Sequence, residues 1–195
     1  MTVTYRSLML FEFMLYAEHL KRLSDADRYM RFEALVPDEA IDRYVAGIRR
    51  ANAVVIGVFD GEGELRGAAH VARVGRSAEL GLSVEKGFRG RGLGSQLLDE
   101  AISSARILGA SSFCALCLAR NGWMRRQLRK RGFELSREGG CILAERDLLP
   151  ANPPLLAAAI VRDSLGWVWN LSHAVFGSAQ QLAAAAMRER EMSAT

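Results

Sequence analysis

The chain has 195 residues, half of them hydrophobic and a quarter charged, with a formal net charge of +4 and a sequence pI near 9.2. This length fits one domain with an added tail, and the composition excludes a disordered chain. The modest basic excess suits an anionic ligand, but it is too small to indicate nucleic-acid binding. Three cysteines without a secretory leader argue against a disulfide framework and favour a cytoplasmic protein.

Helices are expected at the front of the chain and a hairpin after them. Residues 8–22 are rich in Leu, Met and Phe, Ser24 caps a short helix that reaches Phe32, and Pro37 starts another that reaches Arg50. Two β-branched or alternating runs, Ala53–Phe59 and Leu65–Val74, flank an acidic, glycine-containing turn. The central sheet therefore begins after two or three helices.

The next strand, residues 78–85, alternates with the period of two that is typical of a half-buried strand. Its apolar face carries Leu80, Leu82 and Val84. Its other face, which is free to meet a ligand, carries Glu79, Gly81, Ser83 and Glu85. From about Gly92 to Gly109 apolar residues recur every three or four positions, which predicts a helix.

A glycine-rich loop joins this strand to this helix. It places Gly90, Gly92 and Gly94 at the helix N-terminus, where uncovered backbone N–H groups and the helix dipole favour an anion such as a diphosphate. The spacing does not match the dinucleotide-binding GxGxxG pattern, and no lysine precedes Ser95 as a P-loop would require. A simple turn that precedes a surface helix is the alternative.

The remaining elements are a strand at residues 112–118, a basic helix at 121–131, and strands near 133–137 and 141–146. Cys114 and Cys117 are three positions apart on a strand, so they point to opposite faces and are expected to be structural thiols. The three histidines are scattered singly and show no metal-binding spacing. No metal site is predicted.

The strand, loop and helix resemble motif A of the GNAT N-acetyltransferase superfamily, in which Arg/Gln-x-x-Gly-x-Gly/Ala binds the pyrophosphate of acetyl-CoA. Here the pattern is Arg89, Gly92 and Gly94. Asn121 and the pair Gly132-Phe133 look like motif B of the same family, although helix caps alone would also explain Asn121 and Gly132. The resemblance covers roughly residues 5–148.

The resemblance implies a GNAT fold of the α/β (α+β) class, with a mixed, mostly antiparallel central sheet flanked by helices. It implies an acetyltransferase domain over residues 1–149, with acetyl-CoA as co-substrate, no metal, and a splayed pair of parallel strands that admits the pantetheine arm. The residues expected to bind the cofactor are Leu82, Ser83, Val84, Arg89, Gly90, Arg91, Gly92, Leu93, Gly94, Ser95 and Asn121.

The resemblance also suggests a general base. Related lysine acetyltransferases carry a glutamate at the position of Glu79, an ordinary exposed carboxylate being the alternative, and Glu85 on the same face is the second candidate. Many relatives carry a tyrosine, eight positions into motif B, that protonates the departing thiolate. The aligned residue here is Leu128, so the general acid stays unassigned.

Residues 19–32 are similar to an early segment of stand-alone bacterial acetyltransferases related to the catalytic domain of protein-lysine acetyltransferases. That segment carries an Arg-Leu-Ser…Arg-x-x-Arg-Phe pattern, and the resemblance implies that it covers the acceptor side of the cleft, although capped helices with solvated arginines would look alike. The expected function is acetyl transfer from acetyl-CoA to a primary amine, on a protein lysine or a small molecule. The alternative is a catalytically weak or inactive GNAT module that binds acyl-CoA as a sensor, which Leu128 favours.

A helical C-terminal extension is expected over residues 150–195. Pro150, Pro153 and Pro154 break the chain, and residues 155–188, which include Trp167, Trp169, Leu171, Val175, Leu182 and Arg188, look helical. The longest apolar run there has seven residues, from 155 to 161, against the roughly 20 that span a bilayer. Packing on its own domain, a homodimer contact and a membrane-surface helix remain open.

Overall fold

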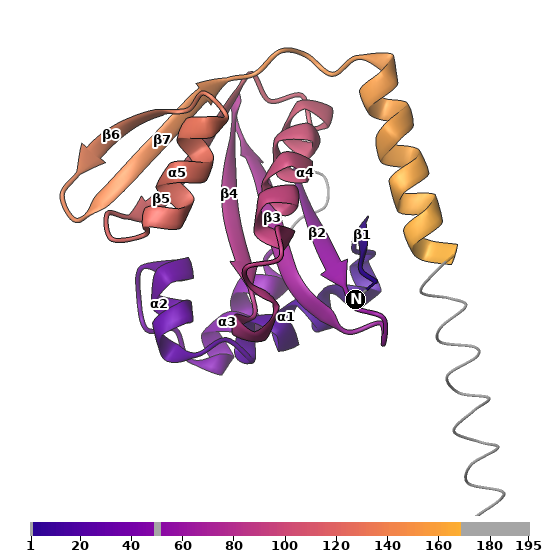
Figure 1. Cartoon of the computed structure of the whole chain (residues 1–195), viewed down its shortest axis with the longest axis horizontal. Coiled ribbons are helices and arrows are strands. Elements are labelled where there is room, and N and C mark those ends of the chain that lie inside the picture. The colour runs from indigo at the N-terminus through magenta and orange to yellow at the C-terminus, as the bar shows by residue number, and fades with distance from the viewer. Residues whose placement is uncertain (1, 49–51, 169–195) are drawn as a thin grey trace, which may run out of the picture.

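The structure is a computed structural model that describes residues 2–48 and 52–168. Its centre is a seven-stranded sheet in the order β1-β2-β3-β4-β5-β7-β6 (Figure 1). Neighbouring strands are antiparallel except for β4 and β5, which are parallel. The strands are β1 (Thr4–Ser7), β2 (Ala53–Phe59), β3 (Leu65–Val74), β4 (Ser77–Val84), β5 (Ser112–Leu118), β6 (Glu134–Glu138) and β7 (Cys141–Asp147). The predicted mixed, mostly antiparallel sheet is confirmed.

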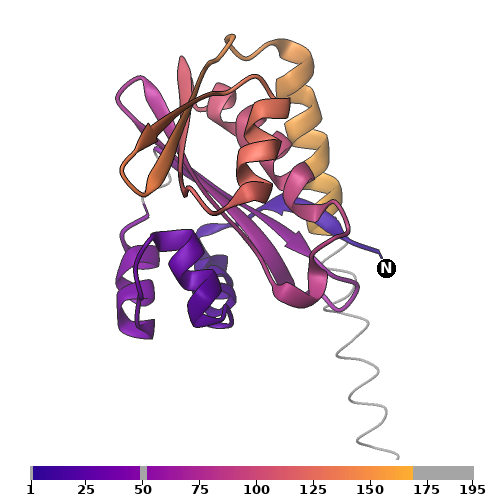
Figure 2. The same ribbon diagram turned by 60° about the vertical axis from the view of Figure 1, so that its left-hand side comes forward.

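Helices cover both faces of this sheet (Figure 2). One face carries the N-terminal helices, and the other carries α4 and α5. The helices are η1 (Leu10–Glu12), α1 (Phe13–Lys21), α2 (Asp25–Phe32), α3 (Asp38–Ala46), η2 (Lys86–Phe88), α4 (Leu93–Ile107) and α5 (Gly122–Lys130).

Strand β2 is central and supplies side chains to both cores. Because successive residues of a strand point to opposite faces, Val55 and Phe59 pack with the N-terminal helices, whereas Ile56 and Val58 pack with the helix α4 side. All four are fully buried. A strand covered on both faces reads as a continuous apolar run, as its sequence AVVIGVF does.

The parallel strands β4 and β5 pair over only three positions. Residues Ser77, Ala78 and Glu79 lie opposite Ser112, Phe113 and Cys114, and no pairing follows although both strands continue for several residues. The two strands therefore separate toward their C-terminal ends. In an α/β sheet this is the edge where ligands are usually bound.

Two details of the front segment differ from the prediction. Strand β1 was not predicted, because it has only four residues and its central Arg6 is a buried arginine that the apolar pattern does not reveal. Its guanidinium is neutralised by Glu12, whose two carboxylate oxygens accept hydrogen bonds of 2.7 Å. The third helix ends at Ala46, before the predicted Arg50, which lies outside the described residues.

The C-terminal extension forms a helix over residues 153–168, at the end of the sheet that carries β1 (Figure 1). Asp163 accepts a hydrogen bond of 3.0 Å from the Ser7 backbone N–H, and Arg162 pairs with Glu100 of α4. The Trp167 ring lies 4.1 Å from the Arg6 guanidinium carbon. This part of the extension therefore packs on its own domain.

The rest of the predicted extension, which includes Trp169, Leu171, Val175, Leu182 and Arg188, lies outside the described residues. None of the described helices combines the length and the apolar character that crossing a bilayer requires.

Candidate active site

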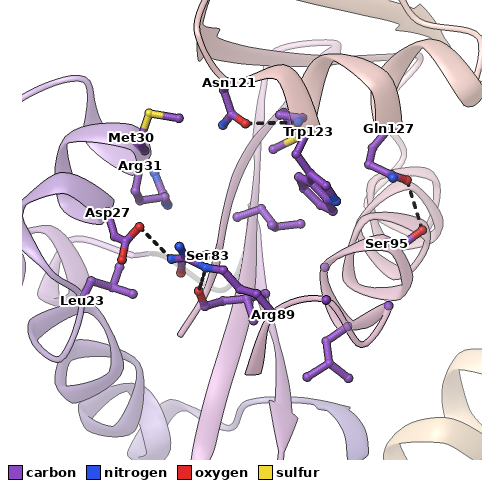
Figure 3. Close-up of a pocket in the computed structure, with 17 residues that line it drawn as sticks. Leu23, Asp27, Met30, Arg31, Ser83, Arg89, Ser95, Asn121, Trp123 and Gln127 are labelled. Atoms are coloured by element: carbon purple, nitrogen blue, oxygen red, sulfur yellow. Dashed lines mark hydrogen bonds and ion pairs between the residues drawn. The ribbon is translucent and has the colours of Figure 1, made fainter. Parts of the chain in front are cut away.

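A cavity of about 420 Å³ lies where β4 and β5 separate (Figure 3). Most of the predicted cofactor residues line it: Leu82, Ser83, Val84, Arg89, Gly90, Gly92, Leu93, Gly94, Ser95 and Asn121. The cofactor residues predicted from the sequence did not include the other lining residues, which come from the turn before α2, from α2 and from α5: Leu23, Asp27, Met30, Arg31, Trp123, Met124 and Gln127. The resemblance of residues 19–32 marks the segment but not these contacts, because the side chains meet the loop only in the folded chain.

The glycine-rich loop has the backbone of an anion site. Gly90 and Gly92 have φ angles of +76° and +81°, which L side chains rarely adopt, and a Cβ on either would meet nothing within 4 Å. Gly92 is the N-cap of α4 and supplies no side-chain capping bond. The first N–H groups of the helix therefore have no side-chain cap, which leaves them available to an anion.

The two arginines of the loop lie differently. Arg89 donates a hydrogen bond of 2.9 Å to the Val84 carbonyl and forms an ion pair of 2.7 Å with Asp27 of α2, across the cavity (Figure 3). Arg91 does not line the cavity; it is exposed, and its guanidinium carbon lies 5.6 Å from the centre of the Phe88 ring.

Asn121 is both a helix cap and a residue of the cavity wall, the two roles that the sequence left open. Its side-chain oxygen accepts a hydrogen bond of 3.1 Å from the Met124 backbone N–H, so it is the N-cap of α5. It also lines the cavity. Ser95 donates a hydrogen bond of 3.2 Å to the Gln127 side chain, which joins the start of α4 to α5.

The two candidate bases are in unlike surroundings. Glu79 is exposed, lies in the paired part of β4 beside Cys114, and does not line the cavity. Glu85 accepts hydrogen bonds of 3.1 Å from His19 and 2.9 Å from Arg22, and these donors lower its pKa to about 2, against the effect of burial. A carboxylate with so low a pKa is a poor base, so the structure argues against Glu85.

A buried histidine links Glu85 to the cavity. His19 is fully buried; its Nδ1 lies 3.1 Å from Glu85 and its Nε2 lies 2.9 Å from the Ser83 hydroxyl. Since the Glu85 carboxylate only accepts, Nδ1 carries the proton and Nε2 accepts from Ser83. Burial lowers the pKa of His19, which keeps the ring neutral. The sequence gave no signal for this pairing of residues more than sixty positions apart.

Two features were sought in the part of the chain that the structure describes, a proton-donating tyrosine and a metal site. Leu128 is fully buried in the core on the α4 side of the sheet, and the described lining residues include no tyrosine. Within the described residues, no group of three or more His, Cys, Asp or Glu is arranged to hold a metal ion. Cys117 is buried, Cys114 and Cys141 are half-buried, and all three thiols are free.

The fold and the loop together define an α/β domain with a glycine-rich loop at a helix N-terminus, beside a cavity between two separated parallel strands. The model of the Acetyltransferase (GNAT) family matches residues 17–133. The chain therefore belongs to the GNAT acetyltransferase family, and the predicted membership is confirmed. Comparison with curated protein sequences found no significant match.

Solved structures share the fold at low identity. The GNAT domain of S. lividans PAT is 24% identical with a TM-score of 0.64, over 74% of this chain and 89% of that chain. A ribosomal-protein-alanine N-acetyltransferase from Brucella melitensis is 21% identical with a TM-score of 0.56, over 74% and 99%. The PaiA N-acetyltransferase from Thermoplasma acidophilum, in complex with coenzyme A, is 16% identical with a TM-score of 0.58, over 76% and 100%.

Proposed function

We propose that this chain transfers the acetyl group of acetyl-CoA to a primary amine of a protein lysine or a small molecule. The observation that carries the proposal is the loop of Gly90, Gly92 and Gly94, which opens at the N-terminus of α4 into the cavity between the separated strands. A relative of the same fold is solved in complex with coenzyme A.

The lining residues fit such a co-substrate. The uncapped N–H groups at the start of α4 suit a diphosphate, and Arg89 adds a guanidinium once it leaves Asp27. The backbone of Leu82 and the Val84 N–H, no longer paired with β5, can hydrogen-bond an extended amide chain, whereas the Val84 carbonyl already accepts from Arg89. The backbone N–H of Val84 or a neighbour would also polarise the thioester carbonyl.

Transfer requires that the amine lose its proton before it attacks. The proposed base is Glu79, which lies on the same face of β4 as Gly81 and Ser83 and is exposed to solvent. The chain of Ser83, His19 and Glu85 offers a second route, because Ser83 lines the cavity and can pass a proton to the neutral ring.

The departing thiolate can take its proton from water, because a thiol pKa not far above about 8.5 makes it a fair leaving group. The buried Leu128 and the lack of a tyrosine among the described lining residues also favour a second function, an inactive GNAT module that senses acyl-CoA. Turnover separates the two functions, since both require binding of acyl-CoA.

Isothermal titration with CoA and acetyl-CoA tests the co-substrate. A Cβ on Gly94 would lie 2.8 Å from the Trp123 ring, so Gly94→Val narrows the cavity and we expect affinity to fall at least about tenfold. A Cβ on Gly87 would meet nothing within 4 Å, so Gly87→Val is the matched control and should bind normally. The proposal fails if the unaltered protein binds neither compound.

The base is tested on a confirmed amine substrate from pH 7 to 9. We expect Glu79→Gln to lower kcat at least about a hundredfold, with little change in acetyl-CoA affinity. Glu134→Gln removes an exposed carboxylate from β6 and serves as the control. Unchanged turnover in Glu79→Gln, together with a large loss in Ser83→Ala, would assign the proton to the His19 route instead.

The remaining proposals concern organisation. An acetyltransferase domain over residues 1–149, a helical extension over 150–195 and a cytoplasmic location stay as predicted from the sequence. A homodimer through the extension is supported by its described helix, which leaves apolar side chains exposed: Leu156, Ile160, Val161, Leu165 and Val168.

A further inference from the structure

The Arg31 guanidinium, on the α2 side of the cavity, has no anionic partner among the described residues. Its Nη2 donates to the hydroxyls of Tyr44 at 2.8 Å and Tyr16 at 3.3 Å, and its carbon lies 4.7 Å from the Phe32 ring centre. Its Nε is buried without a hydrogen-bond partner. Charges that are withdrawn from water are normally paired, so this half-buried cation, with its buried Nε, is a candidate site for an anion.

Next to Arg31, Tyr44 and His70 leave a further N–H donor without a partner and supply no negative charge. Because Arg31 can only donate, the Tyr44 oxygen accepts from it, and the Tyr44 hydroxyl then donates to His70 Nδ1 at 2.7 Å. The proton of His70 is therefore on Nε2, which is buried and unpartnered. Burial and the nearby Arg31 charge lower the pKa of His70 to about 4, so the ring stays neutral.

The guanidinium lies against the middle of β4. A Cβ on Gly81 would be 1.8 Å from Arg31 Nη2, so only glycine admits the arginine here. Gly81 lies on the same face as Glu79 and Ser83 and three positions before Val84, about 10 Å along the strand. The loop at Gly92 thus has its own donors for a diphosphate, while Arg31 serves a different part of the same cavity (Figure 3).

We propose that Arg31 binds the carboxylate of the acceptor, and that the acceptor is a small amine with a carboxylate, such as a free amino acid. The inference rests on the proposed acetyl transfer, since it names the class of amine. A guanidinium pairs with a carboxylate through two parallel hydrogen bonds: Arg31 Nε has no hydrogen-bond partner for one of them, and Nη2 would exchange a tyrosine hydroxyl for the carboxylate to make the other. The amine of such an acceptor would then be held along β4, where Glu79 and Ser83 lie on the same face as Gly81.

The test compares each of the twenty free amino acids with its carboxamide as acceptor, by release of the CoA thiol from acetyl-CoA. We expect kcat/KM to favour the free carboxylate at least about a hundredfold, because the amide leaves the half-buried cation unpaired. In Arg31→Gln the preference should fall below about threefold, with the affinity for CoA unchanged by calorimetry. Arg43→Gln removes an exposed guanidinium from α3 and should behave as the unaltered protein.

Two further variants test the proposal if Arg31→Gln does not fold. Gly81→Ala keeps the charge but displaces the guanidinium, so it should also abolish the preference. Arg31→Lys keeps the positive charge but lacks the planar guanidinium, so this variant should retain only part of the preference for the free carboxylate. If Arg31→Gln loses kcat/KM equally with the free amino acids and with their carboxamides, Arg31 acts on the oxyanion of the transition state and the proposal is overturned.

Direct binding separates this inference from the proposed function. Saturation-transfer NMR with the same amino acids, with and without CoA, reports occupancy even when no turnover is seen. If CoA binds and no amino acid is bound or acetylated, the Arg31 inference fails while the co-substrate assignment stands. If CoA does not bind, the proposed function fails, and amino-acid binding that is lost in Arg31→Gln would still support the carboxylate site.

Discussion

Acidification should destabilise the protein through His70, in a window that its environment sets. The pKa of the folded-state ring is about 4, against about 6.5 in the unfolded chain. Between these values the unfolded chain binds one proton more than the native state, so stability rises with pH. The contribution of His70 is therefore complete above pH 6.5 and is lost as pH falls toward 4.

The size of the effect follows from the difference between the two pKa values. At about 1.4 kcal/mol per pH unit, protonation of unfolded His70 removes about 2.5 kcal/mol between pH 7 and pH 4.5. This is a large part of a typical stability of about 5 to 15 kcal/mol. The pKa of His19 is also lowered, so its protonation in the unfolded chain destabilises the protein further as the pH falls.

Urea unfolding at several pH values from 7.5 to 4.5 measures the loss, and His70→Asn isolates it. The asparagine oxygen can still accept from Tyr44, but it does not titrate. We expect the stability of the unaltered protein to fall about 2.5 kcal/mol more than that of the variant over this range. Parallel curves for the two proteins would refute the neutral, buried state that we assign to His70.

Three further predictions test other parts of the molecule. Phe113→Ala should cost about 3 to 5 kcal/mol in urea unfolding, since its fully buried ring packs 5.9 Å from that of Phe133. Asp27→Asn should raise CoA affinity about two- to fivefold by calorimetry, because the ion pair with Arg89 no longer competes with phosphate. Ile160 and Leu165 are each 66% exposed, so their joint replacement by Lys should reduce a dimer to a monomer in light scattering. The control Leu149→Lys, at a residue 78% exposed, should leave the mass unchanged, and an unaltered protein that is already monomeric contradicts the dimer.

The sequence predicted the parts of the site that are local in the chain. Arg89, Gly92 and Gly94 lie within six positions, and the strand before them and the helix after them have clear apolar periods. Because the conformation of such a segment depends mainly on its own residues, its sequence pattern predicts the geometry of the loop. Strand β2, strand β3 and strand β5 were likewise predicted at their observed bounds.

On the acceptor side of the cavity, the resemblance of residues 19–32 indicated the segment, but the contacts of its side chains could not be predicted. Arg31 meets Gly81 fifty positions later, and His19 meets Ser83 more than sixty positions later. Their sequence neighbourhood shows an ordinary capped, charged helix, and a charged helix face is usually solvated. Arg31 points inward only because α2 packs against β4 and β5. The lack of a side chain at Gly81 then provides the space for the guanidinium.

Helix α2 connects the two halves of the cavity. Asp27 and Arg31 are four positions apart and so lie on one face; Asp27 pairs with the loop residue Arg89, while Arg31 lies over Gly81. The helix has eight residues and none is fully buried; Phe32 at its end packs against the N-terminal core, and the rest is held by polar contacts such as those of Arg28 with backbone carbonyls. An element held mainly by polar contacts belongs to the low-stability end of a fold. A diphosphate that draws Arg89 away from Asp27 therefore loosens the same helix that holds Arg31, and a carboxylate on Arg31 fixes it again. We expect the two ligands to bind with measurable coupling, and α2 is the element through which that coupling acts.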